Sequence, residues 1–214
     1  MSCCQSPQCR GIEEVFDTKL AENELEKYRR GGPWKETRRL LEAVRAQKIE
    51  LRSLLDIGGG VGAIQHELAG ELDAIVNVDA SPAYSQTARS EAERRGYAGR
   101  AQYHVGDFVR LSENLPVADL VTLDRVICCY DDMPALVDAA VRKAGRIIGL
   151  VYPVDRLIFR AGIAVINFFQ RILRRPFRMF IHDSARVDAR IREAGFQPRF
   201  ARKGLFWQVT VYAK

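Results

Sequence analysis

A glycine-rich turn that follows a short apolar segment is the feature that most constrains this chain. Residues 54–62 read Leu-Leu-Asp-Ile-Gly-Gly-Gly-Val-Gly, and a helical pattern begins directly after them. Glycines at a strand-to-helix junction allow backbone N–H groups to approach an anionic, nucleotide-like ligand at the start of the helix. The turn therefore predicts an α/β domain with a nucleotide-type site at the end of its first strand.

The segments that follow the turn favour a parallel sheet. Short β-rich segments alternate with helical patterns, which is typical of a sheet covered by helices on both faces. Ligands of such sheets bind outside the carboxyl ends of the strands. We expect strands at 53–58, 74–79, 101–107, 118–124 and 146–152, and helices at 61–70, 81–96, 108–112 and 133–143.

Both ends of the chain add elements to this pattern. Helices are expected at 12–30 and 34–48, before the first strand, as caps over the ligand-binding edge. A helix at 184–195 precedes two strands, Pro198–Lys203 and Leu205–Ala213, which would insert an antiparallel strand into the sheet. The prediction is a single α/β domain over 1–214, with cap helices in 1–48, a helical insertion at 154–180 and a doubly wound, Rossmann-like, seven-stranded mixed sheet.

Composition sets the class of protein and its compartment. The 214 residues are 47% apolar, which is enough for one sizeable core. No apolar run reaches the roughly 18–20 residues that span a bilayer, and the N-terminus shows no secretory pattern. The five cysteines do not form a disulfide framework, so reduced thiols in a cytoplasmic protein are expected. No cluster with metal-ligand spacing stands out, and Cys3, Cys4 and Cys9 are read as exposed thiols of a tail.

Positive charge is concentrated in the last third of the chain. Residues 151–214 hold 13 Lys and Arg against 4 Asp and Glu, a net +9, whereas residues 1–150 hold 20 against 23, a net −3. Within the basic part, 157–180 is an apolar helix with a basic end. This insertion is a candidate substrate lid or a membrane-interface segment. The regular aromatic and basic pattern of an RNA-binding module is missing, which argues against nucleic acid as a partner.

The glycine turn alone fits two cofactors. Gly58, Gly60 and Ala63 match the dinucleotide pattern G-x-G-x-x-A, whereas Gly58, Gly60 and Gly62 match the G-x-G-x-G found in enzymes that use S-adenosylmethionine (SAM). Asp56 favours SAM, because a carboxylate beside the turn suits a ligand with an ammonium and a cationic sulfur better than a pyrophosphate. Asp79 ends the second strand, where a carboxylate binds ribose hydroxyls of either cofactor.

Asp107 and Phe108 end the third strand, where an acid accepts from an adenine amino group and an aromatic ring stacks on the base. Together with the terminal hairpin, this pair resembles the class I SAM-dependent methyltransferases over about residues 50–153. The resemblance implies SAM as cofactor. It also implies a cofactor site that includes Asp56, Gly58, Gly59, Gly60, Gly62, Asp79, Ala80, Tyr84, Asp107, Phe108 and Asp124.

The end of the fourth strand supplies the catalytic candidates. The segment Val126–Tyr130, with Asp124 before it, is similar to magnesium-protoporphyrin O-methyltransferases, which have a histidine where Cys129 stands. That resemblance also matches Tyr28 to a tyrosine on an N-terminal helix, which would close over the cofactor. Arg125 is a candidate to orient an anionic acceptor. We therefore name Cys129, Tyr28 and Arg125 as catalytic candidates, with small pocket walls as the alternative role of Cys128 and Cys129.

The sequence thus indicates an enzyme that transfers a methyl group from SAM to a small-molecule acceptor, either anionic or lipophilic. Two alternatives remain open at this point. An NAD(P)-dependent oxidoreductase would need a hydride-transfer site such as a Tyr–Lys pair, and none is evident. A membrane-interface binding protein with a degenerate methyltransferase fold would bind lipid without turnover.

Overall fold

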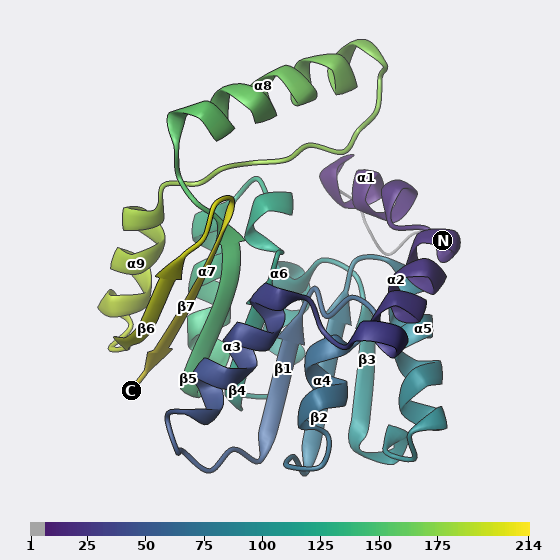
Figure 1. Ribbon diagram of the computed structural model, residues 1–214, viewed down its shortest axis with the longest axis vertical. Coiled ribbons are helices and arrows are strands. Elements are labelled where there is room, and N and C mark those ends of the chain that lie inside the picture. The colour runs from purple at the N-terminus through teal and green to yellow at the C-terminus, as the bar shows by residue number, and fades with distance from the viewer. Residues whose placement is uncertain (1–6) are drawn as a thin grey trace.

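A seven-stranded mixed sheet forms the centre of the molecule, and the computed structural model describes residues 7–214 (Figure 1). The strands run in the order β3-β2-β1-β4-β5-β7-β6. Strands β1 to β5 are mutually parallel, and β7 lies between β5 and β6, antiparallel to both. Their bounds are β1 Ser53–Ile57, β2 Ala74–Asp79, β3 Ala101–Val105, β4 Ala118–Asp124, β5 Ala144–Pro153, β6 Gln197–Lys203 and β7 Trp207–Ala213. The predicted seven-stranded mixed sheet with an antiparallel C-terminal strand is confirmed.

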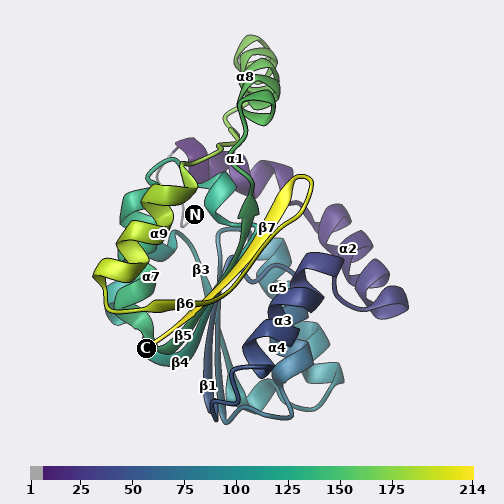
Figure 2. The same cartoon turned by 60° about the vertical axis from the view of Figure 1, so that its left-hand side comes forward.

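Helices cover both faces of the sheet, as the edge-on view in Figure 2 shows. Helices α3, α4 and α5 lie on one face, and α7 and α9 on the other. Adjacent strand residues point to opposite faces of the sheet. Leu54 belongs to the hydrophobic cluster on one face, with Leu40 of α3, and Leu55 to the cluster on the other face, with Leu136 of α7. The central strands therefore read as continuous apolar runs, which is typical of a parallel sheet buried on both sides. The α-helices are α1 Pro7–Val15, α2 Thr18–Gly31, α3 Lys35–Arg45, α4 Ala63–Leu68, α5 Pro82–Arg94, α6 Phe108–Leu111, α7 Met133–Lys143, α8 Leu157–Ile172 and α9 Ser184–Glu193.

The N-terminal region differs from the sequence prediction, because the helix expected at 12–30 is two helices. Asp17 starts α2, and its side chain accepts a hydrogen bond from the Leu20 N–H at 2.8 Å. An acidic side chain that caps an N-terminus interrupts the preceding helix, since the capping residue leaves helical geometry. The break allows Phe16 to turn towards the sheet, where its carbonyl accepts from the Ser81 hydroxyl at 2.6 Å.

The cysteine prediction is wrong for Cys9, which is disulfide-bonded. It is also buried, at 5% exposure, so it is not an exposed thiol of a tail. Cys128 and Cys129 form no disulfide, as expected. Cys3 and Cys4 lie outside the described residues.

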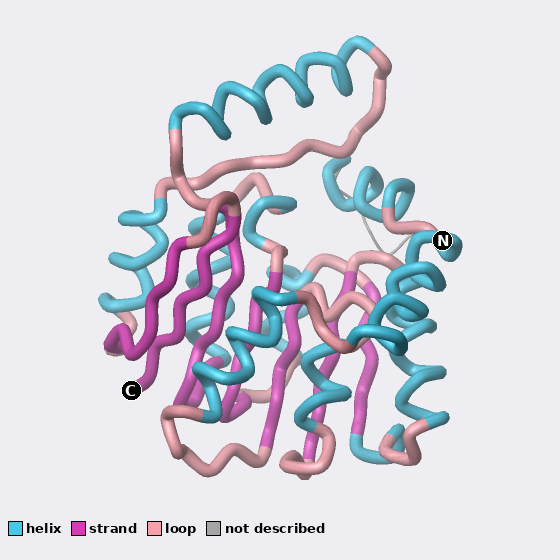
Figure 3. Tube along the Cα trace, in the orientation of Figure 1, coloured by secondary structure: helices cyan, strands magenta, loops and turns pink. Residues whose placement is uncertain are grey.

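Helix α8 stands apart from the rest of the molecule. Figures 1 and 2 show it projecting beyond the carboxyl ends of the parallel strands, joined by one connection from β5 and one long segment back to α9. We call residues 173–182 the return segment, and Figure 3 shows them as a loop that runs back beneath α8. Over residues 7–214, no helix is long and apolar enough to cross a membrane.

Candidate active site

The glycine turn joins β1 to α4 in a conformation that favours glycine. Gly58 has φ +59° and Gly60 φ +57°, and a Cβ on Gly58 would lie 2.4 Å from the Val126 side chain. The Gly58 N–H donates to the Val78 carbonyl at 2.7 Å, which fixes the turn on β2. Gly59 lies between these residues, and Gly62 occupies the N-cap position of α4. The backbone is therefore exposed to a ligand that approaches the end of β1.

Asp56 lies beneath this turn, buried at the sheet's centre. Its Oδ1 accepts a hydrogen bond from the Thr122 hydroxyl at 2.7 Å, while its Oδ2 is buried and has no hydrogen-bond partner among residues 7–214. Burial raises the pKa of Asp56 to about 7, and the Thr122 hydrogen bond opposes that rise. A small cavity of about 50 Å³ adjoins Asp56 and the turn. A cationic ligand group there would give the carboxylate a counter-charge and its missing partner.

Asp79 ends β2 on the other side of the turn. Its Oδ2 accepts from the Gly60 N–H at 2.9 Å and its Oδ1 from the Ser81 N–H at 2.8 Å. Burial raises the pKa of Asp79 to about 6. Asp79 and the adjacent Ala80 line a larger cavity of about 400 Å³ at the carboxyl ends of the strands. From the sequence, we expect the ribose hydroxyls of a nucleoside at this position.

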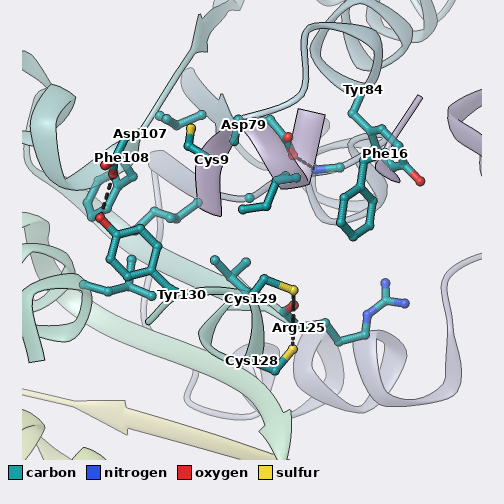
Figure 4. A pocket seen from close by; sticks show the side chains of 18 of the residues that line it. Cys9, Phe16, Asp79, Tyr84, Asp107, Phe108, Arg125, Cys128, Cys129 and Tyr130 are labelled. Carbon is teal, nitrogen blue, oxygen red and sulfur yellow. Dashed lines mark hydrogen bonds between the residues drawn. The ribbon is translucent and has the colours of Figure 1, made fainter. Parts of the chain in front are cut away.

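Asp107 and Phe108 form one end of the larger cavity (Figure 4). Asp107 caps α6 and accepts from the Val109 N–H at 3.0 Å. The Tyr130 hydroxyl also donates to Asp107, at 2.8 Å, across the cavity wall. Two donors thus hold the carboxylate beside the buried Phe108 ring, which gives this end a polar edge and an aromatic face.

Tyr84 and Phe16 come from distant parts of the chain and line the same cavity. Tyr84 lies on α5, and its ring meets the ring of Phe16 edge to face, with centroids 5.6 Å apart. Phe16 makes a second edge-to-face contact with Phe177 of the return segment, at 5.9 Å. Aromatic contacts therefore connect the N-terminal caps to the segment that follows α8.

The end of β4 brings Asp124 and Arg125 to both cavities. Asp124 accepts from the buried Thr37 hydroxyl of α3 at 2.5 Å and from Arg125 Nε at 3.2 Å. Arg125 has a positive φ of 63°, which is uncommon for a residue other than glycine, and its N–H donates to the Val151 carbonyl at 2.7 Å. Its guanidinium lies 4.9 Å from the centre of the Trp34 ring. The backbone and Trp34 thus hold Arg125 where the two cavities meet.

Cys128 and Cys129 are neighbouring thiols in the wall of the larger cavity, with their sulfur atoms 3.7 Å apart (Figure 4). Cys128 is almost fully buried and donates to the Arg125 carbonyl at 3.3 Å. Its contact with Cys129 and its burial raise the pKa of Cys128 well above the ordinary value. Cys128 is therefore a neutral thiol near pH 7. This favours a packing role for Cys128 in the cavity wall over a role as a thiolate nucleophile or base.

Tyr28 lies on the glycine-turn side and lines the smaller cavity with Arg125. Its hydroxyl donates to Glu67 Oε1 at 2.9 Å, and burial raises the pKa of Tyr28. The guanidinium of Arg95 lies 5.1 Å from the centre of its ring. The structure thus brings Tyr28 to Arg125 and the turn, whereas Cys129 lines the larger cavity.

Several lining residues were not singled out from the sequence, although Phe177 and Met179 lie in the insertion named as a candidate lid. Phe177 and Met179 of the return segment and Trp207 of β7 each line the larger cavity with an apolar side chain. None of α8 lines this cavity, whereas the return segment does. Tyr130 could have been found, because it ends the same motif as Cys129, but its bond to Asp107 depends on the tertiary fold. Over 7–214, no group of three or more His, Cys, Asp or Glu side chains could hold a metal ion.

Comparison with known proteins gives the family. The family model for the O-methyltransferase domain matches residues 15–158, about two thirds of the chain. No curated protein matches significantly. The magnesium protoporphyrin IX methyltransferase of Synechocystis PCC 6803, solved with bound S-adenosylhomocysteine (SAH), is 16% identical with a TM-score of 0.71, over 97% of this chain and 99% of that one.

Two further structures share the fold. Phosphoethanolamine N-methyltransferase 2 of Haemonchus contortus, in complex with SAM, has a TM-score of 0.71 at 14% identity, over 98% of this chain and 60% of that one. An O-methyltransferase family 2 protein of Planctomyces limnophilus, in complex with apigenin, has a TM-score of 0.56 at 19% identity, over 76% of this chain and 50% of that one.

The fold, with two cavities at the carboxyl ends of its strands, and the matching family model define a class I SAM-dependent methyltransferase. The chain belongs to the O-methyltransferase domain family, and its cofactor is SAM. The oxidoreductase alternative is set aside by this family assignment.

Proposed function

We propose that this protein transfers the methyl group of SAM to an oxygen atom of a small, lipophilic acceptor that carries an anionic group. The observation that carries the proposal is the composition of the larger cavity. Its lining includes Asp79 at the end of β2 and Asp107 just after β3, together with the apolar side chains of Phe177, Met179 and Trp207. Among its described lining residues, Arg125 is the only cation and no histidine or lysine is present.

We assign the cofactor to the acidic strand ends and the glycine turn. Asp56, with its unpartnered buried oxygen, would accept from the ammonium group of the cofactor. Asp79 retains lone pairs for the ribose hydroxyls, since each of its oxygens accepts one backbone N–H. Asp107 and Phe108 would hold the base, with Tyr84 on the other side of the cavity. The charges are complementary in this assignment, because the cationic cofactor would lie beside carboxylates of the protein.

The acceptor would occupy the apolar part of the cavity. Phe177, Met179 and Trp207 offer apolar and aromatic surface but no side-chain charge. Such a wall selects a lipophilic molecule, and Arg125 supplies the charge that would orient an anionic group. Solved relatives named for magnesium protoporphyrin IX and for a complex with apigenin support an aromatic or otherwise lipophilic acceptor.

The chemistry suits an acceptor that is already ionised. SAM supplies a methyl group on a cationic sulfur, and the reaction forms an O–CH3 bond as the S–CH3 bond breaks and its electron pair returns to sulfur. The chain has to align the acceptor oxygen with the methyl carbon and exclude water, which can supply most of the rate enhancement. Cys128 is a neutral thiol, so it does not remove a proton. A carboxylate needs no base, and we therefore propose a carboxylate oxygen as the nucleophile.

A methyl-transfer assay tests the proposal. The protein is incubated with SAM labelled on its methyl group and a panel of lipophilic carboxylic acids, with the matched alcohols and amines as controls, and products are identified by mass spectrometry. We expect methyl esters. Arg125→Gln should raise KM for the acids about tenfold or more and leave SAH affinity within a factor of about three, because it removes one charged hydrogen bond to the acceptor. Methylation of the amines alone, or equal KM values for the variant and the unaltered protein, would contradict it.

A further inference from the structure

Helix α8 presents an apolar face that the rest of residues 7–214 leaves uncovered. Of the twelve large apolar side chains exposed within residues 7–214, eight belong to α8 and the residue after it. They are Leu157, Ile158, Val165, Ile166, Phe168, Phe169, Ile172 and Leu173, each between 46% and 84% exposed. Ile163 is the one buried residue of the helix. Contiguous exposed apolar surface of this kind marks an interaction site.

The exposed residues share one side of the helix. At roughly 100° per residue, the eight side chains fall within about half of the circumference of α8. Asn167 lies on the opposite half, where its amide donates to the Met179 carbonyl at 2.6 Å and its oxygen accepts from the Met179 N–H at 3.0 Å. The return segment therefore holds the polar side of α8, and the apolar face points away from the protein.

Positive charge surrounds this face. Residues 156–182 contain six arginines and no acidic residue: Arg156, Arg160, Arg171, Arg174, Arg175 and Arg178. Arg174 and Arg175 follow the last turn of the helix and are exposed. The tip of the β6–β7 hairpin joins the same surface, because Phe206 contacts Phe159 of α8 with ring centroids 5.0 Å apart, and the neighbouring Leu205 is 80% exposed. Figure 1 shows the hairpin turn below the start of α8.

We propose that α8 and the hairpin tip dock this protein on an anionic lipid bilayer. The apolar face of α8 enters the acyl boundary, and the arginines at its edges contact lipid phosphates. A second copy of the chain is the poorer occupant, because it would bring two arginine clusters of like charge together, and Asp155 is already paired with Arg160 at 2.6 Å. A helix of 16 residues is about 24 Å long, so it lies in the interface and does not span it.

Docking on a bilayer would place the larger cavity next to the lipid. The return segment runs from the end of α8 into the cavity wall, where Phe177 and Met179 line it, and Asn167 fastens Met179 to the helix. If the proposed acceptor is lipophilic, it could enter from the membrane along this segment. That consequence rests on the proposed function, whereas the docking itself does not.

Vesicle flotation of the full chain tests the docking without any methyl-transfer readout. The vesicles contain phosphatidylcholine alone or with phosphatidylglycerol. We expect flotation only with the anionic vesicles. Phe168→Ser/Phe169→Ser should lower the partition coefficient at least about tenfold, because two large apolar side chains no longer insert. Arg174→Glu/Arg175→Glu should lower it similarly by removing phosphate contacts.

The control is Arg142→Glu/Arg199→Glu, which changes the net charge equally at exposed positions of α7 and β6 and should leave flotation unchanged. SAH binding by each variant shows that the variant is folded. It also distinguishes a failure of the docking proposal from a failure of the methyltransferase assignment. Absence of flotation with anionic vesicles would overturn the proposal. So would equal loss in the control, or a dimer in solution that Phe168→Ser/Phe169→Ser converts to monomers while no vesicle is bound.

Discussion

Asp56 shows how the site is built at the scale of one residue. A buried carboxylate with an unpartnered oxygen destabilises the fold when it is ionised. It would be satisfied only when a cationic ligand group lies beside it. If Asp56 binds the cofactor as proposed, it trades stability of the free protein for affinity, which is a recurrent feature of functional sites.

We predict that Asp56→Asn stabilises the free protein at pH 8 and weakens SAH binding. In the folded protein the pKa is raised from 3.8 to about 7, so the folded state binds more protons than the unfolded chain between these values. The charge is therefore most destabilising above pH 7, and the asparagine should gain roughly 1–3 kcal/mol at pH 8. The gain should disappear as pH falls towards 4. Denaturant unfolding at several pH values measures it, and a gain that grows at low pH would contradict the assignment.

Gly58 is the second test at the residue scale. Gly58→Ala places a Cβ 2.4 Å from the Val126 side chain at a φ of +59°, so it should destabilise the protein by about 1–3 kcal/mol and reduce SAH affinity about tenfold. Gly70→Ala is the matched control, because nothing lies within 4 Å of its Cβ and its φ is not in the left-handed region. Calorimetry of SAH binding with both variants distinguishes them; equal affinities would show that the turn does not form the cofactor site.

At the scale of elements, one buried carboxylate joins the cap helix α2 to α5. Glu91 is fully buried and pairs with Arg29 of α2 at 2.6 Å, with Arg94 at 2.5 Å and with Arg95 at 2.8 Å. The hydrogen bond from Arg94, together with those from Arg29 and Arg95, holds the pKa of Glu91 well below its usual range. The pairing therefore stabilises the fold at neutral pH, and this stabilisation is lost as pH falls below the ordinary glutamate range.

We predict that Glu91→Gln destabilises the protein by about 2 kcal/mol at pH 7, because three arginines lose a shared buried partner. The difference from the unaltered protein should shrink as the pH is lowered below about 4. Glu26→Gln is the control, since its pair with Arg30 is exposed on both sides and should change stability by less than about 0.5 kcal/mol. Unfolding curves at pH 7 and pH 3.5 measure both; equal effects of the two variants would contradict the role of Glu91.

The sequence predicted the elements of the sheet well, for a physical reason. Strands β1 to β5 are apolar runs that end in turns, and the motif residues at their carboxyl ends depend on local geometry alone. The break between α1 and α2 was missed, because the charged helical pattern continues through Phe16 and Asp17. It is caused by the Asp17 cap and by the Phe16 contacts with Tyr84 and Phe177, which are long-range.

At the scale of the whole molecule, the site joins segments from both ends of the chain. The residues proposed for the cofactor could be chosen from the sequence, because their acids follow the order of the strands. The residues proposed for the acceptor side could not, because Phe177 and Met179 of the return segment and Trp207 of β7 line one cavity only in the folded protein. The surroundings of Tyr28 were also predicted only in part, because a helical pattern gives no information on the hydrogen bond from Tyr28 to Glu67. Contacts between remote segments carry no local signal, and under the proposed function these residues would decide which acceptor fits.

The measurement that tests the central claim most directly is titration calorimetry of the free protein with SAH, and with NAD and NADP as controls. We predict one SAH site per chain that is weakened at least about tenfold by Asp79→Ala, which removes the acceptor proposed for the ribose. At 100 times its dissociation constant, SAH should also stabilise the protein by about 2.7 kcal/mol. Binding of NAD or NADP in place of SAH, or SAH affinity unchanged by Asp79→Ala, would contradict the account.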